Sequence, residues 1–282
     1  MPTSVAPPLR LTALLFTPGS RPDRFAKAAV SAADGVIVDL EDAVPVPDKD
    51  RVRGEVVAYF REHGRIGMPP FVSALRINNP RTESGRRDLE AVAAAGLQLD
   101  LLMLPKVESA DEIRQVAAHL PGIPLLGLIE TIQGVRRCAS IAEASPAVVA
   151  LGFGGYDLSA ETGGEPTWDA LLWPRTQLVH ACAGVGIVAL DQPYIDLDND
   201  AGLAEECACA RALGFSGKLA IHPKQCAGIK AAFQPTAAQA DRARRLVAAF
   251  EAAGGNVANI DGQMIDVPMY RSAQRVLRRA GE

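Results

Sequence analysis

The sequence lacks the features that would place a protein on a nucleic acid or in a membrane. Among 282 residues, 29 Lys and Arg stand against 33 Asp and Glu, and no block of basic residues forms. No stretch approaches the roughly 18 apolar residues of a membrane span. The N-terminus lacks the basic segment and apolar core of a signal peptide. We therefore expect no nucleic acid partner, no membrane partner and a cytoplasmic location.

The cysteines are few and scattered, at positions Cys138, Cys182, Cys207, Cys209 and Cys226. Only the pair Cys207 and Cys209 is close in sequence, and one intervening residue is poor spacing for a metal site. We expect buried, unpaired thiols in a reducing compartment, which agrees with a cytoplasmic location.

What the sequence does contain is a repeat of short apolar runs and amphipathic stretches. The runs cover Leu11–Phe16, Gly35–Leu40, Phe71–Ile77, Leu101–Leu104, Pro124–Ile129, Val148–Phe153, Ile187–Leu190 and Lys218–Ile221. Uniformly apolar runs are typical of parallel strands buried on both faces. The stretches between them have helical spacing, and Ser84 and Ser109 are the expected N-caps of two helices.

Eight strand–helix repeats predict an α/β protein with a (β/α)8 TIM barrel. An open, doubly wound sheet is the rival, but its Gly-rich turn is absent after the first run, where Thr17-Pro18-Gly19-Ser20 stands instead. We expect the barrel to form a catalytic domain over residues 1–233. Residues 234–282 are then a C-terminal helical extension, with Gly254-Gly255 between two helices and a basic last helix.

Charged and polar residues follow the predicted strands at or near their carboxyl ends. They are Asp39, Glu41, Asp42, Arg76, Lys106, Glu130, Asp157, Asp191 and His222. In a TIM barrel these strand ends converge on one rim, where the active sites of this fold lie. The alternation of acids and bases around that rim predicts a catalytic site.

Glu130 and Asp157 are the expected metal ligands. Carboxylate oxygens are hard ligands that suit Mg²⁺, which keeps waters and takes few protein ligands. The rim has no paired His or Cys, which argues against zinc. Asp39, Glu41 and Asp42 then fit an outer shell around the metal's waters. Helix capping is the alternative role for Glu130 and Asp157, and a buried structural role is the alternative for Asp39.

Three cationic positions have more than one interpretation. Arg76 presents a planar fork suited to a carboxylate or an enolate oxygen, or forms a salt bridge with a rim acid. Ser20 and Arg21 precede a helix start that suits a phosphate, or belong to an ordinary helix N-terminus. Lys106 could pair with the same acids, and its role stays open at this point. For His222 a structural hydrogen-bonding role is favoured over that of a catalytic base.

Eight segments together resemble the citrate lyase β-subunit family, part of the HpcH/HpaI aldolase/citrate lyase superfamily and its CoA-ester lyases, which include malyl-CoA and citramalyl-CoA lyases. The segments are LFTPGSRPDRF, VIVDLEDAVP, LRINNP, LMLPKVES, GLIETIQGV, GFGGYDLSAETG, KLAIHPKQ and DGQMIDVPM. They extend from residue 14 to about residue 270, and each alone is weak. The resemblance implies a TIM barrel, a homotrimer or hexamer, Mg²⁺, a coenzyme A thioester as substrate and carbon–carbon cleavage.

The resemblance also assigns roles to individual residues. Glu130 and Asp157 match the metal ligands, and Arg76 matches the arginine that contacts the reacting substrate. Glu41 and Asp42 match the acids at metal-bound water. Asp266 matches a C-terminal aspartate that related lyases insert into a neighbouring subunit's site, which makes the extension a lid.

The expected reaction is the cleavage of a 3-hydroxy-3-carboxyl acyl-CoA of the citryl-, malyl- or citramalyl-CoA type to acetyl-CoA and a 2-oxo acid. Two alternatives stay open. The chain is a citrate lyase β subunit that acts only on a thioester carried by an acyl-carrier subunit, or it is a CoA-independent pyruvate aldolase of the same superfamily.

Overall fold

A computed structural model of the chain describes residues 9–260 and 263–281. Residues 1–8 lie outside this range, and the expectation of no signal peptide depends on them. The first two residues of DGQMIDVPM, a segment used for the family resemblance, also lie outside it. The chain divides between Lys230 and Ala231 into two compact units.

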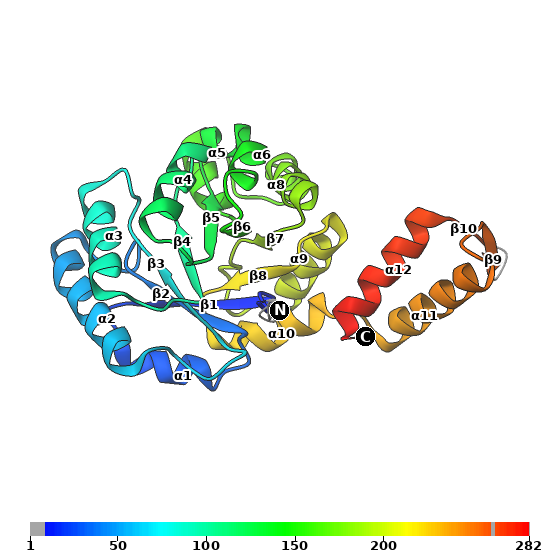
Figure 1. Cartoon of the computed structure of the whole chain (residues 1–282), viewed down its shortest axis with the longest axis horizontal. Coiled ribbons are helices and arrows are strands. Elements are labelled where there is room, and N and C mark those ends of the chain that lie inside the picture. The colour runs from blue at the N-terminus through cyan, green and yellow to red at the C-terminus, as the bar shows by residue number, and fades with distance from the viewer. Residues whose placement is uncertain (1–8, 261–262, 282) are drawn as a thin grey trace, which may run out of the picture. The chain divides into compact units, whose positions relative to one another are not determined.

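The first unit contains a closed barrel of eight parallel strands in chain order (Figure 1). The strands are β1 (Ala13–Pro18), β2 (Gly35–Asp39), β3 (Val72–Arg76), β4 (Leu101–Leu104), β5 (Leu125–Ile129), β6 (Val148–Phe153), β7 (Val188–Asp191) and β8 (Gly217–Ala220). The pairing of β1 with β8 closes the barrel. The predicted TIM barrel is confirmed, and each strand overlaps one of the eight predicted runs.

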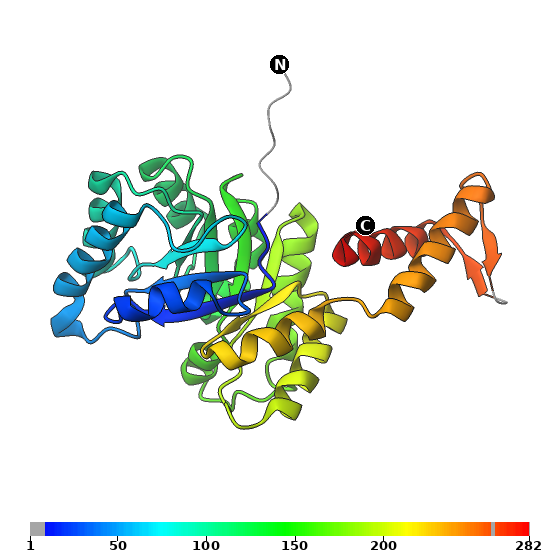
Figure 2. The same ribbon diagram turned by 90° about the horizontal axis from the view of Figure 1, so that it is seen from below.

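The helices of this unit cover the outside of the barrel (Figure 2). They are η1 (Pro22–Arg24), α1 (Phe25–Ala29), η2 (Val46–Asp48), α2 (Lys49–His63), α3 (Glu83–Ala95), α4 (Ala110–His119), α5 (Ile132–Arg136), α6 (Cys138–Ala142), α7 (Gly155–Thr162), α8 (Leu172–Val185), α9 (Asp200–Leu213) and α10 (Pro223–Phe233). Ser109 caps α4 as predicted, by accepting a hydrogen bond from the Glu112 amide. The prediction for Ser84 is wrong, because Thr82 caps α3 by accepting from the amide of Gly85.

Apolar side chains fill both faces of the strands. All eight strands contribute to one buried cluster, which therefore fills the barrel interior, with Leu14, Ile37, Ala74, Met103, Leu126, Ala150, Leu190 and Leu219 among its members. Alternate residues such as Val36 and Val38 are also fully buried and face the helices. Burial of both faces explains why the strands appear in the sequence as continuous apolar runs.

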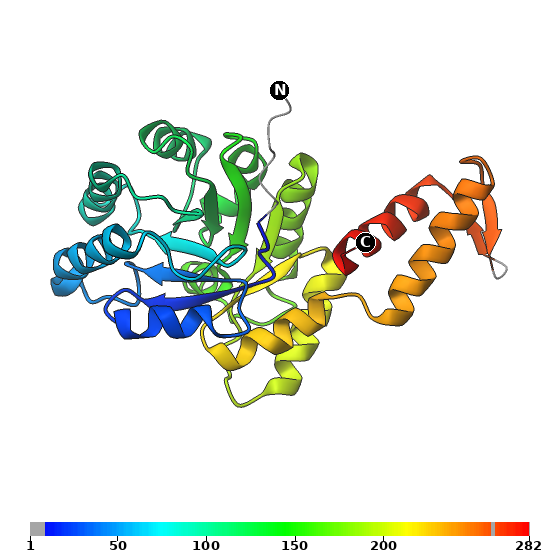
Figure 3. The same ribbon diagram turned by 60° about the horizontal axis from the view of Figure 1, so that its bottom comes forward.

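The second unit consists of two helices joined by a hairpin (Figure 3). Its elements are α11 (Ala237–Ala252), β9 (Ala258–Ile260), β10 (Gln263–Ile265) and α12 (Val267–Ala280). The rings of Phe250 and Tyr270 stack with centroids 4.6 Å apart and join the two helices. The sequence predicted both helices but not the hairpin. The lid role predicted for this unit stays a prediction.

Within the described residues, no helix combines the length and the apolar character needed to cross a bilayer. All five cysteines are unpaired, and four of them are buried.

Candidate active site

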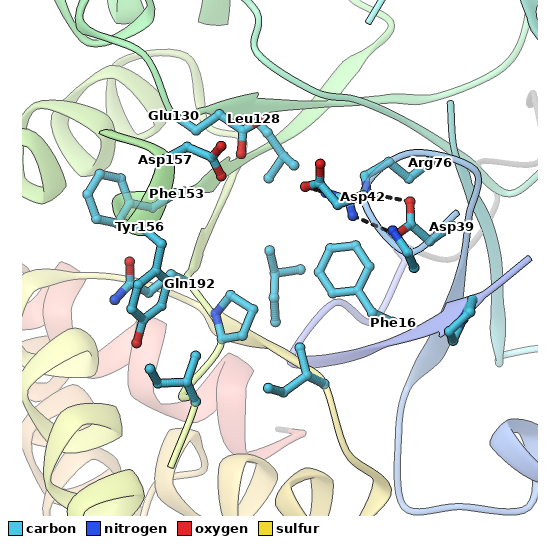
Figure 4. A pocket seen from close by; sticks show the side chains of 17 residues that line it. Phe16, Asp39, Asp42, Arg76, Leu128, Glu130, Phe153, Tyr156, Asp157 and Gln192 are labelled. Atoms are coloured by element: carbon cyan, nitrogen blue, oxygen red, sulfur yellow. Dashed lines mark hydrogen bonds and ion pairs between the residues drawn. The ribbon is translucent and has the colours of Figure 1, made fainter. Parts of the chain in front are cut away.

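A pocket of about 460 Å³ opens at the carboxyl ends of the barrel strands (Figure 4). Its lining includes Phe16, Pro18, Asp39, Asp42, Arg76, Glu130, Phe153, Gly154, Tyr156, Asp157, Gln192 and Ile221. These residues stand at or just after the ends of β1, β2, β3, β5, β6, β7 and β8. The barrel therefore gathers five of the predicted rim residues in one cavity.

Asp39 and Arg76 form a buried bidentate ion pair at the ends of β2 and β3. The Arg76 Nε and Nη2 atoms donate to the two Asp39 carboxylate oxygens at 2.7 and 2.6 Å. The same oxygens accept the backbone amides of Glu41 at 2.8 Å and Ala43 at 3.1 Å. These four donors fill the hydrogen-bond acceptor sites of the Asp39 carboxylate. Asp39 therefore holds Arg76 and the loop after β2 in place, which is a structural role.

The remaining Arg76 nitrogen faces the other acids. Its Nη1 atom lies 2.8 Å from Glu41 Oε2 and 3.5 Å from Asp42 Oδ2. Glu41 Oε2 is buried without an aligned hydrogen bond, so this contact is an ion pair only. Burial disfavours the charged guanidinium, but the hydrogen bonds and charge of Asp39 outweigh burial and raise the pKa of Arg76. Arg76 is therefore a fixed cation at the pocket wall.

Lys106 is a second cation that contacts the acids of the rim. Its Nζ atom lies 2.8 Å from Glu41 Oε1 and 3.5 Å from Asp157 Oδ1. Its backbone amide donates to Glu130 Oε1 at 2.8 Å. We name Glu41, Asp42, Glu130 and Asp157 together the acid cluster. Lys106 contacts three of its four members.

Glu130 is a buried carboxylate pressed against Gly154. The Glu130 side chain is almost fully buried, yet Figure 4 shows it beside Asp157 at the pocket. A Cβ atom at Gly154 would lie 2.5 Å from Glu130 Oε2 and 2.4 Å from its Cβ. Only glycine fits there. The N-cap of the next helix is Thr131, which accepts from the Gly134 amide, so Glu130 is not a helix cap.

Glu130 has an elevated pKa, which gives a test in metal-free protein. Burial raises its pKa to about 8, with Asp157 and Glu41 adding and Lys106 opposing. Between the ordinary value of 4.5 and about 8, the native state holds a proton that the unfolded state lacks, so stability falls as pH rises. Glu130→Gln removes this loss. From about pH 5 to about pH 8 in EDTA, the variant should gain a few kcal/mol relative to wild type, at about 1.4 kcal/mol per pKa unit.

Thermal unfolding at a series of pH values measures this difference. We expect the melting temperature of the variant minus that of wild type to increase as the pH rises. A difference that stays constant with pH would show that Glu130 keeps an ordinary pKa in the folded protein.

Ser20, Arg21, Asp191 and His222, all named from the sequence, are not among the residues that line the pocket. Arg21 pairs with Asp23 at 2.9 Å on the surface, and the helix after Ser20 is a three-residue 3-10 turn. Asp191 is fully buried against Arg175 and Lys218, at 2.9 and 2.6 Å. His222 is exposed, and its Nδ1 accepts the amide of Lys224 at 3.2 Å. The phosphate role of Ser20 and Arg21 stays a prediction.

Asp266 lies in the second unit as the N-cap of α12. Its Oδ1 atom accepts the amide of Met269 at 3.1 Å. The adjacent Ile265 is buried, whereas Met264 and Val267 are exposed. The catalytic role implied for Asp266 stays a prediction.

Three residues of the site were not assigned by sequence reasoning. Tyr156 and Gln192 line the pocket, and Lys106 holds the acid cluster. Tyr156 immediately precedes Asp157, so the sequence could have predicted that Tyr156 lies near the rim. Lys106 has a backbone φ of 51°, a conformation that no signal in the sequence predicts for a residue other than glycine.

Comparison with known proteins identifies the family. Residues 12–223 match the HpcH/HpaI aldolase/citrate lyase family, and the chain belongs to it. A citrate lyase subunit beta-like protein of Mycobacterium tuberculosis is 37% identical over 275 residues, covering 95% of both chains. A (3S)-malyl-CoA thioesterase of Cereibacter sphaeroides is 35% identical over 272 residues, covering 95% of this chain and 93% of its own.

A solved structure agrees with this relationship over nearly the whole chain. The protein CitE of Mycobacterium tuberculosis, in complex with magnesium, acetoacetate and coenzyme A, superposes with a TM-score of 0.81. The two proteins share 34% sequence identity, and the match covers 96% of this chain and 98% of that one. The predicted family and its enzymatic character are confirmed.

Proposed function

We propose that the protein is a Mg²⁺-dependent carbon–carbon lyase. Its substrate is a 3-hydroxy-3-carboxyl acyl-CoA of the citryl-, malyl- or citramalyl-CoA type, and its products are acetyl-CoA and a 2-oxo acid. The observation that carries the proposal is the pair Glu130 and Asp157 in one pocket with Arg76. The relative solved with magnesium, acetoacetate and coenzyme A supports it.

Glu130 and Asp157 would hold the Mg²⁺. Both offer hard carboxylate oxygens, and a cation would offset the unfavourable buried charge of Glu130. Among the described residues, no group of three or more His, Cys, Asp or Glu is arranged to hold a metal ion. Mg²⁺ is commonly bound by one or two carboxylates together with waters and substrate oxygens. When bound, it supplies Lewis acidity and a template for the substrate oxygens.

The chain's own residues would then carry the proton and charge movements. The substrate 3-hydroxyl gives its proton to the acid cluster, where burial raises the pKa of Glu41 and makes it a better base. As the hydroxyl oxygen becomes the carbonyl oxygen of the 2-oxo acid, the C2–C3 bond breaks. Its electron pair moves onto the thioester as an enolate. Arg76 stabilises the enolate oxygen, and Asp266 protonates C2 to release acetyl-CoA.

Replacement of Arg76 by Lys should lower kcat far more than it changes KM. A point charge cannot reproduce the guanidinium fork at a developing oxyanion, and loss of one such donor typically lowers kcat by roughly 10²- to 10³-fold. Lys is more informative than Ala here, because Ala would leave the buried Asp39 charge unpaired, at about 3–5 kcal/mol. Steady-state kinetics of thioester cleavage measures the effect.

Arg53→Lys is the matched control. Arg53 pairs with the buried Asp88 at 2.5 Å between α2 and α3, and neither residue lines the pocket. This variant should lose stability to a similar extent and keep its kcat. An unchanged kcat in Arg76→Lys would remove Arg76 from the reaction.

The direct test of the function is a panel of substrates. The pure protein is incubated with Mg²⁺ and citryl-, malyl-, methylmalyl- or citramalyl-CoA, and acetyl-CoA or propionyl-CoA is followed together with the 2-oxo acid. Stoichiometric release of both products from one of these esters is the expected result. If none is cleaved, while a thioester on an acyl-carrier protein is, the chain is a citrate lyase β subunit. Cleavage of non-thioester substrates alone would identify a CoA-independent aldolase.

Thioester hydrolysis is the second candidate function. A relative with nearly the same coverage is named a (3S)-malyl-CoA thioesterase. Hydrolysis of malyl-CoA would release malate and free coenzyme A thiol, whereas cleavage releases acetyl-CoA and glyoxylate. The two are separated by assaying the thiol and the 2-oxo acid in the same reaction.

The remaining predictions concern context. We propose a homotrimer or a dimer of trimers, in which the extension of one chain closes the site of the next. A cytoplasmic location is supported by the five unpaired cysteines. Ser20 and Arg21 are proposed to contact a phosphate of coenzyme A.

A further inference from the structure

The conformation of Lys106 is unusual and is fixed by the acid cluster. Its φ of 51° lies in the left-handed region, which non-glycine residues seldom adopt and which occurs often at functional sites. Two interactions hold the residue there. The backbone amide binds Glu130 Oε1, and the ammonium contacts Glu41 and Asp157. One residue therefore binds both proposed metal ligands, from its main chain and from its side chain.

The Lys106 ammonium lies beside Asp157, one of the two proposed metal ligands. Arg76, whose side chain pairs with other carboxylates of the acid cluster, has two of its nitrogens bound to Asp39 and its third directed at Glu41 and Asp42. Lys106 alone, among the described residues, pairs with Asp157. Its side chain is only 29% exposed. An ammonium and a divalent cation cannot both occupy the space beside the same carboxylate oxygen, which here is Asp157 Oδ1.

We propose that the Lys106 ammonium is the resident counter-ion of the acid cluster, and that a divalent cation bound by Glu130 and Asp157 has to displace it. This inference rests on the proposed metal site. The flexible four-carbon stem of lysine lets the ammonium leave while the backbone amide keeps its bond to Glu130. The released charge then becomes available to an anionic oxygen of the substrate. The place of the Lys106 ammonium thus depends on the metal.

Affinity for the metal is the first test. Isothermal titration calorimetry of the full chain with Mg²⁺ or Mn²⁺ should show tighter binding by Lys106→Met than by wild type. We expect at least about tenfold, because a charge 4–6 Å from a carboxylate changes its affinity for a proton by roughly ten- to a thousandfold. Lys106→Arg keeps the charge and should not tighten binding. Lys224→Met is the matched control, because Lys224 is a lysine whose partner, Asp198, lies outside the acid cluster.

Chemical labelling is the second test, and it follows the ammonium itself. A lysine-acylating reagent and mass spectrometry should show that Mg²⁺, without substrate, increases the modification of Lys106 in wild-type protein and leaves that of Lys224 unchanged.

The outcomes separate this inference from the proposed function. Equal or weaker metal binding by Lys106→Met, or unchanged labelling of Lys106, would overturn the displacement while leaving the metal site in place. If wild type and every variant bind no divalent cation, the proposed metal site is wrong and the inference is overturned with it.

Discussion

Glu130→Gln is expected to abolish metal-dependent turnover and to leave the fold intact. Glutamine keeps the volume of the side chain, which matters against Gly154, and its amide oxygen can still accept the Lys106 amide. The variant loses only the negative charge and one strong oxygen ligand. Because even residues that merely support a ligand change metal affinity or activity by roughly 10- to 100-fold, we expect a loss of more than about a hundredfold.

Calorimetric Mg²⁺ titration and steady-state kinetics measure this loss, and circular dichroism checks the fold. Glu161→Gln is the matched control, because Glu161 lies on α7, the helix that also carries Asp157, and accepts the amide of Ile132 at 2.9 Å. The control should remain active. Full activity of Glu130→Gln, or a metal-soaked crystal with the ion elsewhere, would refute the assignment of the metal ligands.

Asp266→Asn is expected to keep substrate and Mg²⁺ binding and to lose turnover. Asparagine is as good an N-cap as aspartate and can accept the Met269 amide, so the start of α12 should persist. What disappears is the proton that the carboxyl group would deliver to the enolate. General acid catalysis contributes typically 10²- to 10⁴-fold. Exchange of the α-protons of acetyl-CoA, followed by NMR in deuterated water, should be lost together with cleavage.

Asp241→Asn is the control in the same unit, because Asp241 is an exposed acid on α11 paired with Arg244 at 3.0 Å. It should behave as wild type. Intact turnover and exchange in Asp266→Asn would limit Asp266 to its capping role.

Mixing two inactive variants tests where Asp266 acts. Hybrid oligomers of Asp266→Asn and Glu130→Gln chains should recover part of the activity if a lid from one chain completes the site of another. Mass spectrometry of the mixture establishes that subunits have exchanged. Exchange without recovery would mean that each extension serves its own barrel.

The barrel was predictable from the sequence because both faces of its strands are buried. Residues such as Val36 and Ile37 face different sides and both are fully buried, so each strand is a short apolar run that periodicity detects. Helix starts were less predictable. Thr82 and Ser84 are both good capping residues, and only the backbone conformation decides that Thr82 accepts the amide. The β9–β10 hairpin spans too few residues for a periodic signal.

The candidate site was predictable as a set of residues and not as a set of contacts. Strand ends gave Asp39, Arg76, Glu130 and Asp157, because parallel strands in a barrel end on one rim. That Asp39 binds Arg76, and that Lys106 binds Glu41, depends on side chains 37 and 65 positions apart. A single sequence contains no record of such pairings. The left-handed backbone of Lys106 occurs at the same contacts, and the sequence does not predict it either.

The four hydrogen bonds accepted by Asp39 have a consequence for how the site works. They fasten Arg76 and the loop after β2 to the same carboxylate, so neither can move without the other. Their mutual orientation is settled once, when the chain folds, and does not have to be found again in each catalytic cycle. A more mobile rim would lose conformational entropy each time substrate binds. Here that loss occurs when the chain folds. Any adjustment between empty and occupied enzyme must therefore fall on parts without this anchor.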